Sequence, residues 1–569
     1  MAHELDAVEL EIQWQRLISL LAEAALTVIR TSISKIVSEG GDFGCLLYDR
    51  EGRMIAQDAG ISSKLATSPR TMEAVLKKYP AQTMQPGDVI ISNDPWLVFG
   101  HLYDISMIKP LFYRGRLVGF GECFGHVPDV GGSLSNNSRE VYEEGICLPI
   151  VRLMVEGRDN QEIWDVIRSN VRVPDQIEGD IRAFTAALEG VERRVAAFLD
   201  QYRIPDLQPL AEQIISRSEQ ATRASIRKNI PPGVYTNSRV LEAVDASDPL
   251  AIQVAVTVDG DSITVDYTGT SPQSNTGVNC TEVYSYAWTL YAVRCFVSPN
   301  IPYNRGLFVP IQMKAPPGCI LNARHPAPVR MKSSTGTFIP LAIFGAMAKV
   351  IPDRIMAESG NKCILRCYAT ADDGRALADT PHFMGGLGAR YSKDGIACMS
   401  FPGGGSETPV EMIENSLPVT VLHKQLLTDS GGPGRFRGGE GQVIAIRGEA
   451  KTPMTILVQN MKVNTSAAGY IGGKDGVKGM NRMNGKDLPG KATVRLERGD
   501  ILEVRTAGGG GIFDPVERSR SAVADDIAEG LLTIQAARRD YGVSSTDARI
   551  GDETAATGPQ SRREGAANV

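Results

Sequence analysis

Residues 93–132 read NDPWLVFGHLYDISMIKPLFYRGRLVGFGECFGHVPDVGG and hold two His-x-x-Asp pairs, His101 with Asp104 and His126 with Asp129. The whole chain has only 6 histidines, so two of them in this stretch are a concentration. Imidazole and carboxylate groups are common metal ligands in catalytic sites. This stretch is therefore the first candidate for a functional site.

A β-hairpin is predicted to bring the two pairs together. A short apolar strand over 88–92 ends at Asn93-Asp94-Pro95, where Asn and Asp side chains can cap the backbone and Pro fixes φ. Two apolar runs, 105–112 and 117–126, follow on either side of a turn at 113–116. The first pair thus sits just beyond a strand end, and His126 ends the returning strand.

The register of this hairpin decides whether the side chains meet. With a turn centred near Gly115, facing residue numbers sum to about 229 or 230, which puts Asp104 opposite His126 or one place away. Facing Cβ atoms lie roughly 4.5–5.5 Å apart, close enough to share an ion. If His101 and Asp104 stood in one strand, their side chains would point to opposite faces of the sheet. Both can therefore face one ion only if His101 lies in the loop, which Gly100 allows.

We therefore predict one divalent metal ion, Zn²⁺, Mn²⁺ or Fe²⁺, bound by His101, Asp104 and His126 with open positions for water or substrate. Two further carboxylates are candidate catalytic groups: Asp129, to orient a ligand or take a proton, and Asp94 near the strand end. The alternative is a hydrogen-bonded structural role for the histidines and an Asx turn for each aspartate.

Motifs along the whole chain carry a family resemblance. In chain order they are Gly41-Asp42-Phe43-Gly44-Cys45, Asn93-Asp94-Pro95-Trp96, His101-Leu102-Tyr103-Asp104, Gly125-His126-Val127-Pro128-Asp129-Val130-Gly131-Gly132, Tyr142-Glu143-Glu144-Gly145, Asp429-Ser430-Gly431-Gly432, Gly438-Gly439 and Ala507-Gly508-Gly509-Gly510-Gly511. Together they resemble the hydantoinase B/oxoprolinase family. This family includes the B subunits of N-methylhydantoinases, the C-terminal half of 5-oxoprolinases, caprolactamase subunits, and acetone and acetophenone carboxylase subunits.

The first metal segment departs from the family pattern, which usually reads N-D-P-Y-x-G-G-T-H-x-P-D. Here Val98-Phe99-Gly100 replace Gly-Gly-Thr, and Tyr103 replaces Pro. The expected ligands remain, but the wall of the pocket changes. The resemblance therefore does not name the substrate.

The resemblance implies a metal-containing subunit of an ATP-dependent cyclic-amide hydrolase, with ATP and Mg²⁺ held by a separate hydantoinase A-type subunit in a hetero-oligomer. The sequence offers no nucleotide site of its own, because no Lys-Ser/Thr follows Gly508-Gly509-Gly510-Gly511 as a P-loop requires. Two alternatives stay open. One is a subunit of an ATP-dependent ketone carboxylase, in which the ion would hold bicarbonate or an enolate, and the other is a non-catalytic assembly subunit.

The segment Asp429-Ser430-Gly431-Gly432-Pro433 matches the sequence around the nucleophile of trypsin-like proteases. A motif without its structural context is only a hypothesis, and no earlier His and Asp stand in the contexts that fold needs. We predict a tight glycine turn here and no nucleophilic role for Ser430.

Composition and charge fit a soluble enzyme subunit. The chain has 569 residues, 60 Lys and Arg against 66 Asp and Glu, and a net charge of −6, with no basic stripe that would indicate nucleic acid or an anionic membrane. No signal peptide or membrane-length apolar run is recognised, so we expect a cytoplasmic protein. The 9 cysteines are scattered without zinc-finger spacing and are expected to be reduced and mostly buried.

The predicted fold class is α+β with several domains, since single cores stop growing near ~250–300 residues. Residues 1–230 form an α+β domain with the metal-binding hairpin and helices over 8–32, 160–170, 176–201 and 207–228. Residues 231–515 form a β-rich body with glycine-rich turns and inserted helices, one of them an apolar helix over 284–296. Residues 516–569 form a helical tail, with two short helices over 516–530 and 533–541, that ends in a disordered segment.

Overall fold

A seven-stranded antiparallel sheet carries the predicted hairpin, and its strands lie in the order β2-β1-β5-β4-β3-β6-β7. The structure is a computed structural model that describes residues 5–58, 68–241, 250–399, 401–403 and 407–543. The strands of this first sheet are β1 (Phe43–Asp49), β2 (Met54–Gln57), β3 (Val89–Ser92), β4 (Asp104–Tyr113), β5 (Arg116–His126), β6 (Val151–Val155) and β7 (Arg158–Asp159).

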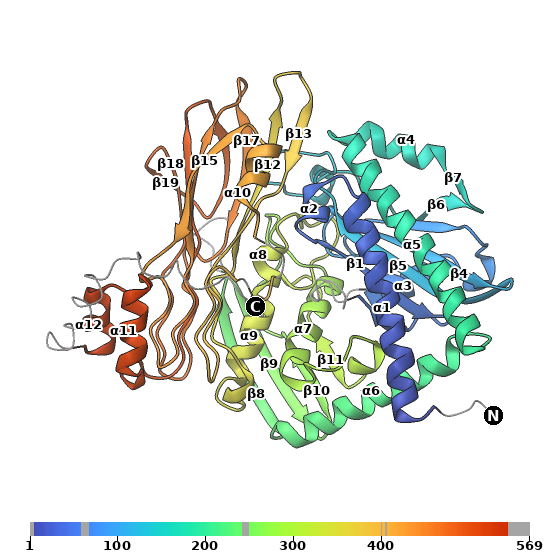
Figure 1. The fold of residues 1–569 in the computed structure, drawn as a ribbon, viewed down its shortest axis with the longest axis horizontal. Helices are drawn as coiled ribbons and strands as arrows, with labels where there is room; N and C mark the ends of the chain where they lie inside the picture. The colour runs from blue at the N-terminus through green and yellow to red at the C-terminus, as the bar shows by residue number, and fades with distance from the viewer. Residues whose placement is uncertain (1–4, 59–67, 242–249, 400, 404–406, 544–569) are drawn as a thin grey trace, which may run out of the picture.

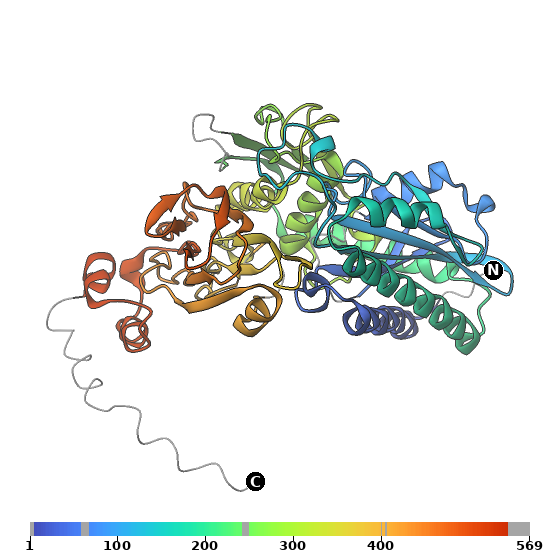
Figure 2. The same cartoon turned by 90° about the horizontal axis from the view of Figure 1, so that it is seen from above.

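Both faces of the first sheet are buried, because alternate residues of its strands enter different cores. Ile90 of β3 and Ile108 of β4 pack toward the second sheet, whereas Ile91 and Met107 pack beneath helices α1 (Ala7–Thr31) and α5 (Pro174–Tyr202). These two helices lie side by side along that face (Figure 1 and Figure 2). A sheet covered on both sides has apolar residues at nearly every position, as these strands do.

Local signals in the sequence explain where the helices of this region begin and end. The carboxylate of Asp6 caps α1 by accepting the backbone N–H groups of Val8 at 2.9 Å and Glu9 at 2.8 Å. The other helices in this part of the chain are α2 (Lys35–Ser38), α3 (Ser68–Lys78), α4 (Gln161–Asn170) and α6 (Gln208–Asn229). The long helices agree with the ranges predicted from apolar periodicity.

The hairpin of β4 and β5 has the predicted register, with Asp104 directly opposite His126. The turn is made by Arg114 and Gly115, both at positive φ. His101 lies in the loop before β4, and Gly100 has a φ of +84°, a conformation that favours glycine. The expectation that His101 lies in the loop before the strand is confirmed.

A four-stranded sheet in the order β11-β10-β9-β8 follows the first sheet in the chain. Its strands are β8 (Gly233–Val240), β9 (Ala251–Asp259), β10 (Ser262–Asp266) and β11 (Ile311–Lys314), and it carries the helices α7 (Glu282–Val297) and α9 (Phe338–Met347). Helix α7 agrees with the apolar helix expected over 284–296, whereas α9 was not expected from the sequence. Helix α9 is apolar on all sides and buried, so it shows none of the periodicity that marks a half-exposed helix.

The rest of the β-rich body consists of two five-stranded sheets that enclose a third core cluster. One sheet has β12 (Lys362–Thr370), β13 (Ala376–Asp379), β14 (His382–Met384), β17 (Met454–Asn460) and β20 (Lys491–Leu496). The other has β15 (Val419–Leu426), β16 (Gln442–Gly448), β18 (Met480–Met483), β19 (Lys486–Leu488) and β21 (Ile501–Arg505). Two short helices, α8 (Ser333–Gly336) and α10 (Val410–Ser416), complete this part of the chain.

Glycines from distant parts of the sequence pack backbone against backbone at one end of this body, in a region we call the glycine layer (385–388, 431–441, 469–476 and 507–511). The N–H of Gly386 donates to the carbonyl of Ala507 at 2.9 Å, and the N–H of Gly509 donates to the carbonyl of Gly439 at 2.9 Å. A Cβ added at Gly386 would overlap the carbonyl oxygen of Gly439. The segments lie too close for any side chain.

The predicted glycine turn at 429–432 is therefore only partly right. A turn does form, with the N–H of Ser430 donating to the carbonyl of Leu427 at 3.3 Å and Asp429 at positive φ. Gly431 and Gly432, however, lie beyond it within the glycine layer, where a Cβ on either would meet neighbouring backbone. Their absent side chains permit close packing between segments, a requirement that a single segment does not reveal.

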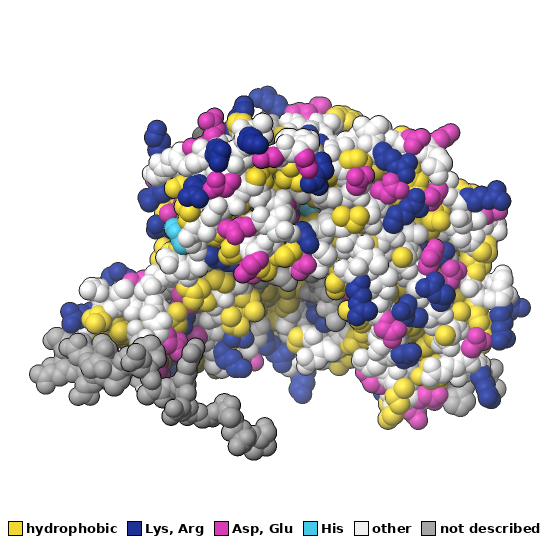
Figure 3. All heavy atoms as spheres, turned by 45° about the horizontal axis from the view of Figure 1, so that its top comes forward, with side chains coloured by type: hydrophobic (Ala, Val, Ile, Leu, Met, Phe, Trp, Pro, Cys, Tyr) yellow, Lys and Arg dark blue, Asp and Glu magenta, His cyan; other side chains and the backbone are white. Residues whose placement is uncertain are grey.

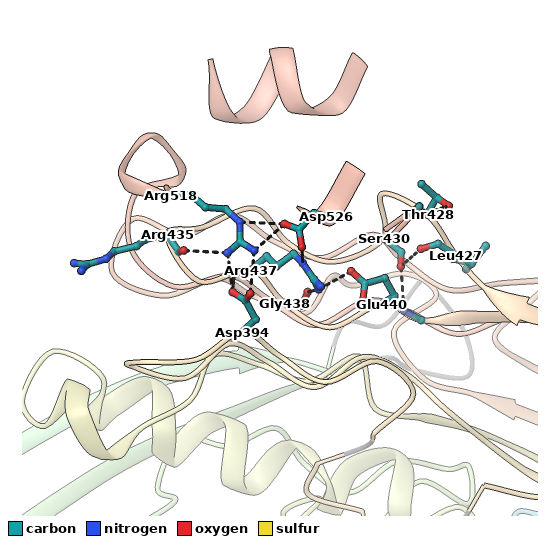
Figure 4. A network of polar contacts seen from close by, with 12 residues as sticks. Asp394, Leu427, Thr428, Ser430, Arg435, Arg437, Gly438, Glu440, Arg518 and Asp526 are labelled. Atoms are coloured by element: carbon teal, nitrogen blue, oxygen red, sulfur yellow. Dashed lines mark hydrogen bonds and ion pairs between the residues drawn. The ribbon is translucent and has the colours of Figure 1, made fainter. Parts of the chain in front are cut away.

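Two C-terminal helices, α11 (Arg520–Ala528) and α12 (Ile534–Tyr541), dock beside the glycine layer through buried ion pairs. Figure 4 shows the guanidinium of Arg518 between Asp394, at 2.8 Å, and Asp526, at 2.7 Å. Arg437 bridges Asp526 at 2.9 Å and Glu440 at 2.7 Å. The first predicted helix, 516–530, is shorter than expected because residues 515–517 form a 3₁₀ turn.

The α+β, multi-domain fold class is confirmed. The boundary at 230 stays a prediction: the second sheet starts at Gly233, but one core cluster holds residues from both sides, such as Ile108 and Phe344. The expected disordered end, 544–569, lies outside the described residues. Within the described ranges, no helix is both long and apolar enough to cross a membrane. On the face drawn in Figure 3, positive and negative side chains are intermixed.

The glycine layer leads to a first prediction. Gly386→Ala should lower the free energy of unfolding by roughly 3 kcal/mol or more, because its methyl group meets backbone that cannot move aside. The matched control is Gly190→Ala inside α5, where the added Cβ meets only the flexible end of Arg194 and helix propensity favours Ala. Chemical denaturation of both variants measures the difference; equal stabilities would contradict the close packing.

Candidate functional site

The three predicted ligands meet at one end of the β4–β5 hairpin. Asp104 is the first residue of β4 and His126 the last residue of β5, while His101 comes from the preceding loop. A ligand atom of each lies within 4.8 Å of the others, and all three side chains are buried. No other group of three or more His, Cys, Asp or Glu side chains with this geometry occurs in the part of the chain that the structure describes.

The hydrogen bonds of His101 indicate which ring nitrogen would bind a metal. Its Nδ1 lies 3.2 Å from the carbonyl oxygen of Arg330, and because that oxygen can only accept, Nδ1 carries the proton. In the neutral ring, Nε2 then directs a lone pair at the Asp104 carboxylate, whose Oδ2 is 2.9 Å away. Two acceptors at this distance repel each other unless a cation lies nearby. The Lys332 ammonium, 2.6 Å from the same Oδ2, is one such cation, and a metal ion between the two acceptors would be a second.

A proton on Nε2 is the less favourable cation. Burial, together with the nearby Lys332 ammonium, lowers the pKa of His101 to about 4, so the ring is neutral at physiological pH. A neutral imidazole held by a backbone carbonyl beside a carboxylate is the usual arrangement of a metal ligand. The donor set therefore fits Zn²⁺, Mn²⁺ or Fe²⁺, with three protein ligands and open positions.

Lys332 is a residue of this site that the sequence analysis missed. Its ammonium lies 2.6 Å from Oδ2 of Asp104, donates to the carbonyl of Phe99, and sits 4.3 Å from the ring centroid of Tyr284. Lys332 is itself buried, and it comes from a segment 228 residues away from Asp104. It balances the charge of the buried carboxylate.

Glu144 and Arg330 fix the segment whose carbonyl orients His101. The Glu144 carboxylate accepts the N–H groups of Val329 at 3.0 Å and Arg330 at 2.9 Å, and the Arg330 guanidinium donates to the carbonyls of Ser133, Ser135 and Glu144. Burial raises the pKa of Glu144 to about 7. These contacts give the Tyr-Glu-Glu-Gly motif a structural role: it positions a histidine far away in sequence.

Tyr103, which replaces the Pro of the family pattern, packs against the ring of His126. The two rings stack with centroids 5.4 Å apart, and the Tyr103 hydroxyl lies 3.2 Å from the hydroxyl of Tyr368 on β12. Tyr103 is not among the residues that line the cavity beside the ligands, so the expectation that this replacement alters the pocket wall stays a prediction. Tyr103 also connects the hairpin to the β-rich body.

The ligands open into a cavity of about 60 Å³, room for a handful of water molecules. Besides the three ligands, its lining includes Asp42, Tyr284, Trp288, Lys332, Lys362, Arg366 and His382. Lys362 and Arg366 project from alternate positions of β12, while Cys363 and Cys367 on the other face enter the third core cluster. The alternation of charged and apolar residues along β12 was a signal in the sequence that could have indicated Lys362 and Arg366 as site residues.

The two predicted catalytic aspartates lie outside the lining of this cavity. The carboxylate of Asp129 is paired with the Arg172 guanidinium at 2.7 Å and also accepts the Arg172 backbone N–H. Asp94 accepts the N–H of Trp96 at 2.9 Å, as in an Asx turn. These contacts are structural, and a catalytic role for either residue stays a prediction.

Ser430 is held by the backbone on both sides. Its hydroxyl donates to the carbonyl of Leu427 at 2.6 Å and accepts the N–H of Gly441 at 3.0 Å (Figure 4). The side chain is buried, whereas His423, the nearest histidine in sequence, is exposed on β15. The two hydrogen bonds tie the Ser430 hydroxyl to the backbone around the turn, in agreement with the expectation that Ser430 is not a nucleophile.

Comparison with known proteins gives a consistent set of matches. A family model described as Hydantoinase B/oxoprolinase matches residues 6–515. The chain is 28% identical over 574 residues to the putative D-/L-hydantoinase B subunit of Pseudomonas sp. (strain NS671), with 96% of each chain covered. It is 28% identical over 546 residues to 5-oxoprolinase 1 of Arabidopsis thaliana, a match that covers 89% of this chain and 42% of that one.

A solved structure is also similar over almost the whole chain. The crystal structure of the ATP-dependent caprolactamase from Pseudomonas jessenii matches with a TM-score of 0.89 and 26% identity, covering 97% of this chain and 100% of the matched chain. The likeness therefore includes the hairpin, the second sheet and the β-rich body together.

The ligand geometry leads to a second prediction. His126→Ala should reduce the bound divalent metal from about one ion per chain to a small fraction, because one of only three protein ligands is lost. The control is His423→Ala, which removes an exposed histidine of β15 and should leave the metal content unchanged. Elemental analysis of the purified proteins gives the answer, with circular dichroism to verify folding. Full metal content in the His126 variant would refute the assignment.

A third prediction concerns Ser430. Ser430→Ala should cost about 1–2 kcal/mol of stability, since Gly441 loses its hydrogen-bond acceptor in a buried position. Turnover by the complex with the ATP-binding partner, at a temperature where the variant is folded, should stay close to that of the complex with the unmodified protein. Incubation with a fluorophosphonate should leave Ser430 unlabelled; covalent labelling at this residue, detected by peptide mass spectrometry, would show a nucleophile.

Proposed function

The chain belongs to the hydantoinase B/oxoprolinase family, and on that basis we propose that it is the metal-binding subunit of an ATP-dependent cyclic-amide hydrolase. It would act together with a separate, ATP-binding subunit of the hydantoinase A type in a hetero-oligomer. The single observation that supports the catalytic part is the meeting of His101, Asp104 and His126 at a buried cavity.

The residues of the site have separable roles in this proposal. A divalent ion held here would lower the pKa of a bound water toward neutrality and polarise a carbonyl group. The carbonyl of Arg330 keeps the proton of His101 on Nδ1, so that Nε2 faces the other ligands. Lys332 places a positive charge 2.6 Å from Asp104, where it would favour negative charge developing on a reacting oxygen.

A partner is proposed because hydrolysis of an amide needs more than a nucleophile. The amide is resonance-stabilised, and phosphorylation of its oxygen would make the carbon electrophilic. The sequence has no P-loop to arrange such a transfer. One relative is named as the B component of a hydantoinase, and 5-oxoprolinase 1 has more than half of its length outside the match. Both observations favour a separate protein that binds ATP and Mg²⁺. Dependence on ATP in turn favours the cytoplasm.

Cyclic amides such as hydantoins, 5-oxoproline and lactams are the proposed substrate class, following the names of the relatives. The small cavity favours one compact ring rather than a polymer. The substitutions at 98–100 and at Tyr103 do not identify which cyclic amide is the substrate. A ketone carboxylase subunit and a non-catalytic subunit remain the competing assignments, and an activity assay with the partner separates them.

The fourth prediction tests the partnership. The purified chain should neither bind ATP nor hydrolyse cyclic amides alone, because no nucleotide site is expected in it. Addition of the ATP-binding partner should give turnover that depends on both ATP and a divalent metal. Isothermal titration with ATP, and product analysis after incubation with hydantoins, 5-oxoproline, lactams, and ketones with bicarbonate, measure the two properties.

The control for this assay is the complex reconstituted with the His126→Ala variant, which should assemble but not turn over. Saturable ATP binding and full hydrolysis by the isolated chain would overturn the proposal. Carboxylation of a ketone without amide hydrolysis would replace it with the carboxylase assignment. Full activity of the His126→Ala complex would favour an assembly role.

A further inference from the structure

Arg366 on β12 is a buried cation without a carboxylate partner. Its side chain is 2% exposed, and among the residues that the structure describes no Asp or Glu lies within ion-pair distance of its guanidinium. Its Nη1 donates to Oε1 of Gln459 at 3.0 Å, and its Cζ lies 5.5 Å from the ring centroid of Tyr103. Its Nε is buried and makes no hydrogen bond to the described residues.

Burying a guanidinium in this way is unfavourable unless a counter-charge compensates it. Transfer of an ion out of water costs several kcal/mol even after relaxation of the protein, and a neutral amide with one aromatic face recovers only part of that. Arginine stays protonated at neutral pH even when burial lowers its pKa, as it does here. Arg366 therefore has no directly paired anion among the described residues: the Asp104 carboxylate acts on it only from beyond ion-pair distance and is itself paired with Lys332.

The position of Arg366 points to where that anion would lie. Lys362, Ile364 and Arg366 occupy alternate positions of β12, and all three line the cavity that also contains His101, Asp104 and His126. Among the lining residues, Lys332, Lys362 and Arg366 outnumber the carboxylates Asp42 and Asp104. A divalent ion at the three ligands would increase this excess of positive charge.

We infer that Arg366 forms an oxyanion subsite beside the three predicted metal ligands, for a carboxylate-type or phosphate-type group on a small ligand of this cavity. The guanidinium offers parallel N–H donors to two oxygens of such a group. The inference rests on the proposed function for the identity of the ligand as substrate or activated substrate. The subsite itself is inferred from the burial of Arg366, its contacts and its position in the cavity lining.

A purely structural role is the competing explanation. In that case Arg366 would serve through its stacking on Tyr103 and its bond to Gln459, which in turn donates to the hydroxyls of Ser333 and Ser334 at 2.9 Å. Arg366→Met retains much of the side-chain volume but removes the charge and the donors. A structural arginine and a ligand-binding arginine therefore respond differently to this substitution.

The fifth prediction is measured on the full chain, both metal-loaded and after chelation. Phosphate, bicarbonate and acetate are titrated calorimetrically at constant ionic strength, with chloride as the reference anion, and thermal unfolding is recorded with each. At least one oxyanion should bind the unmodified chain and raise its melting temperature. Arg366→Met should weaken that binding at least tenfold and leave the metal content unchanged. Preference for phosphate would indicate a phosphorylated ligand, and preference for acetate or bicarbonate a carboxylate.

The matched control is Arg375→Met, which removes an exposed arginine paired with Asp373 and should bind the oxyanion as the unmodified chain does. If the Met variant does not fold, Arg366→Lys retains the charge without the forked donors and should weaken binding at least fivefold. Absence of oxyanion binding in both metal states, or unchanged affinity in the Arg366 variants, would overturn the inference. Oxyanion binding by the metal-free chain that depends on Arg366 would support it even if the hydrolase proposal failed.

Discussion

The contact on which the site depends is the one between the Asp104 carboxylate and its two buried neighbours. A single oxygen, Oδ2, lies 2.9 Å from Nε2 of His101 and 2.6 Å from the ammonium of Lys332. Asp104 also faces His126 across the hairpin. One fully buried carboxylate thus joins the loop before β4, the end of β5 and a segment 228 residues away.

The second constraint is how closely the backbone segments of the glycine layer approach one another. Glycines such as Gly386, Gly439 and Gly509 allow these segments to share hydrogen bonds with no side chains between them. Gly386 closely follows β14, which pairs with the same strand that carries Lys362 and Arg366. The glycine layer thereby helps to fix β12 against the first sheet, where Tyr368 meets Tyr103. Packing outside the cavity lining thus contributes to the shape of the cavity.

Much of the fold and part of the site were predictable because the signals are local. The helix α1, the hairpin of β4 and β5, and the pairing of Asp104 with His126 follow from periodicity and from a turn whose position sets the register. Helix α9 was missed because it is apolar on every side, so its sequence shows no periodic alternation between an apolar and a polar face. The glycines of 431–432 were assigned to a turn because their neighbours come from other segments.

By itself, then, the sequence determined the family, the fold class and the three side chains that converge at the hairpin. The tertiary structure alone showed that Lys332 neutralises Asp104, that Glu144 and Arg330 orient His101, and that Arg366 lines the same cavity. It also showed Asp129 paired with Arg172, away from that cavity. The physical reason is range: register and periodicity act over a few residues, whereas charge compensation in a buried site depends on which distant strands and loops pack together.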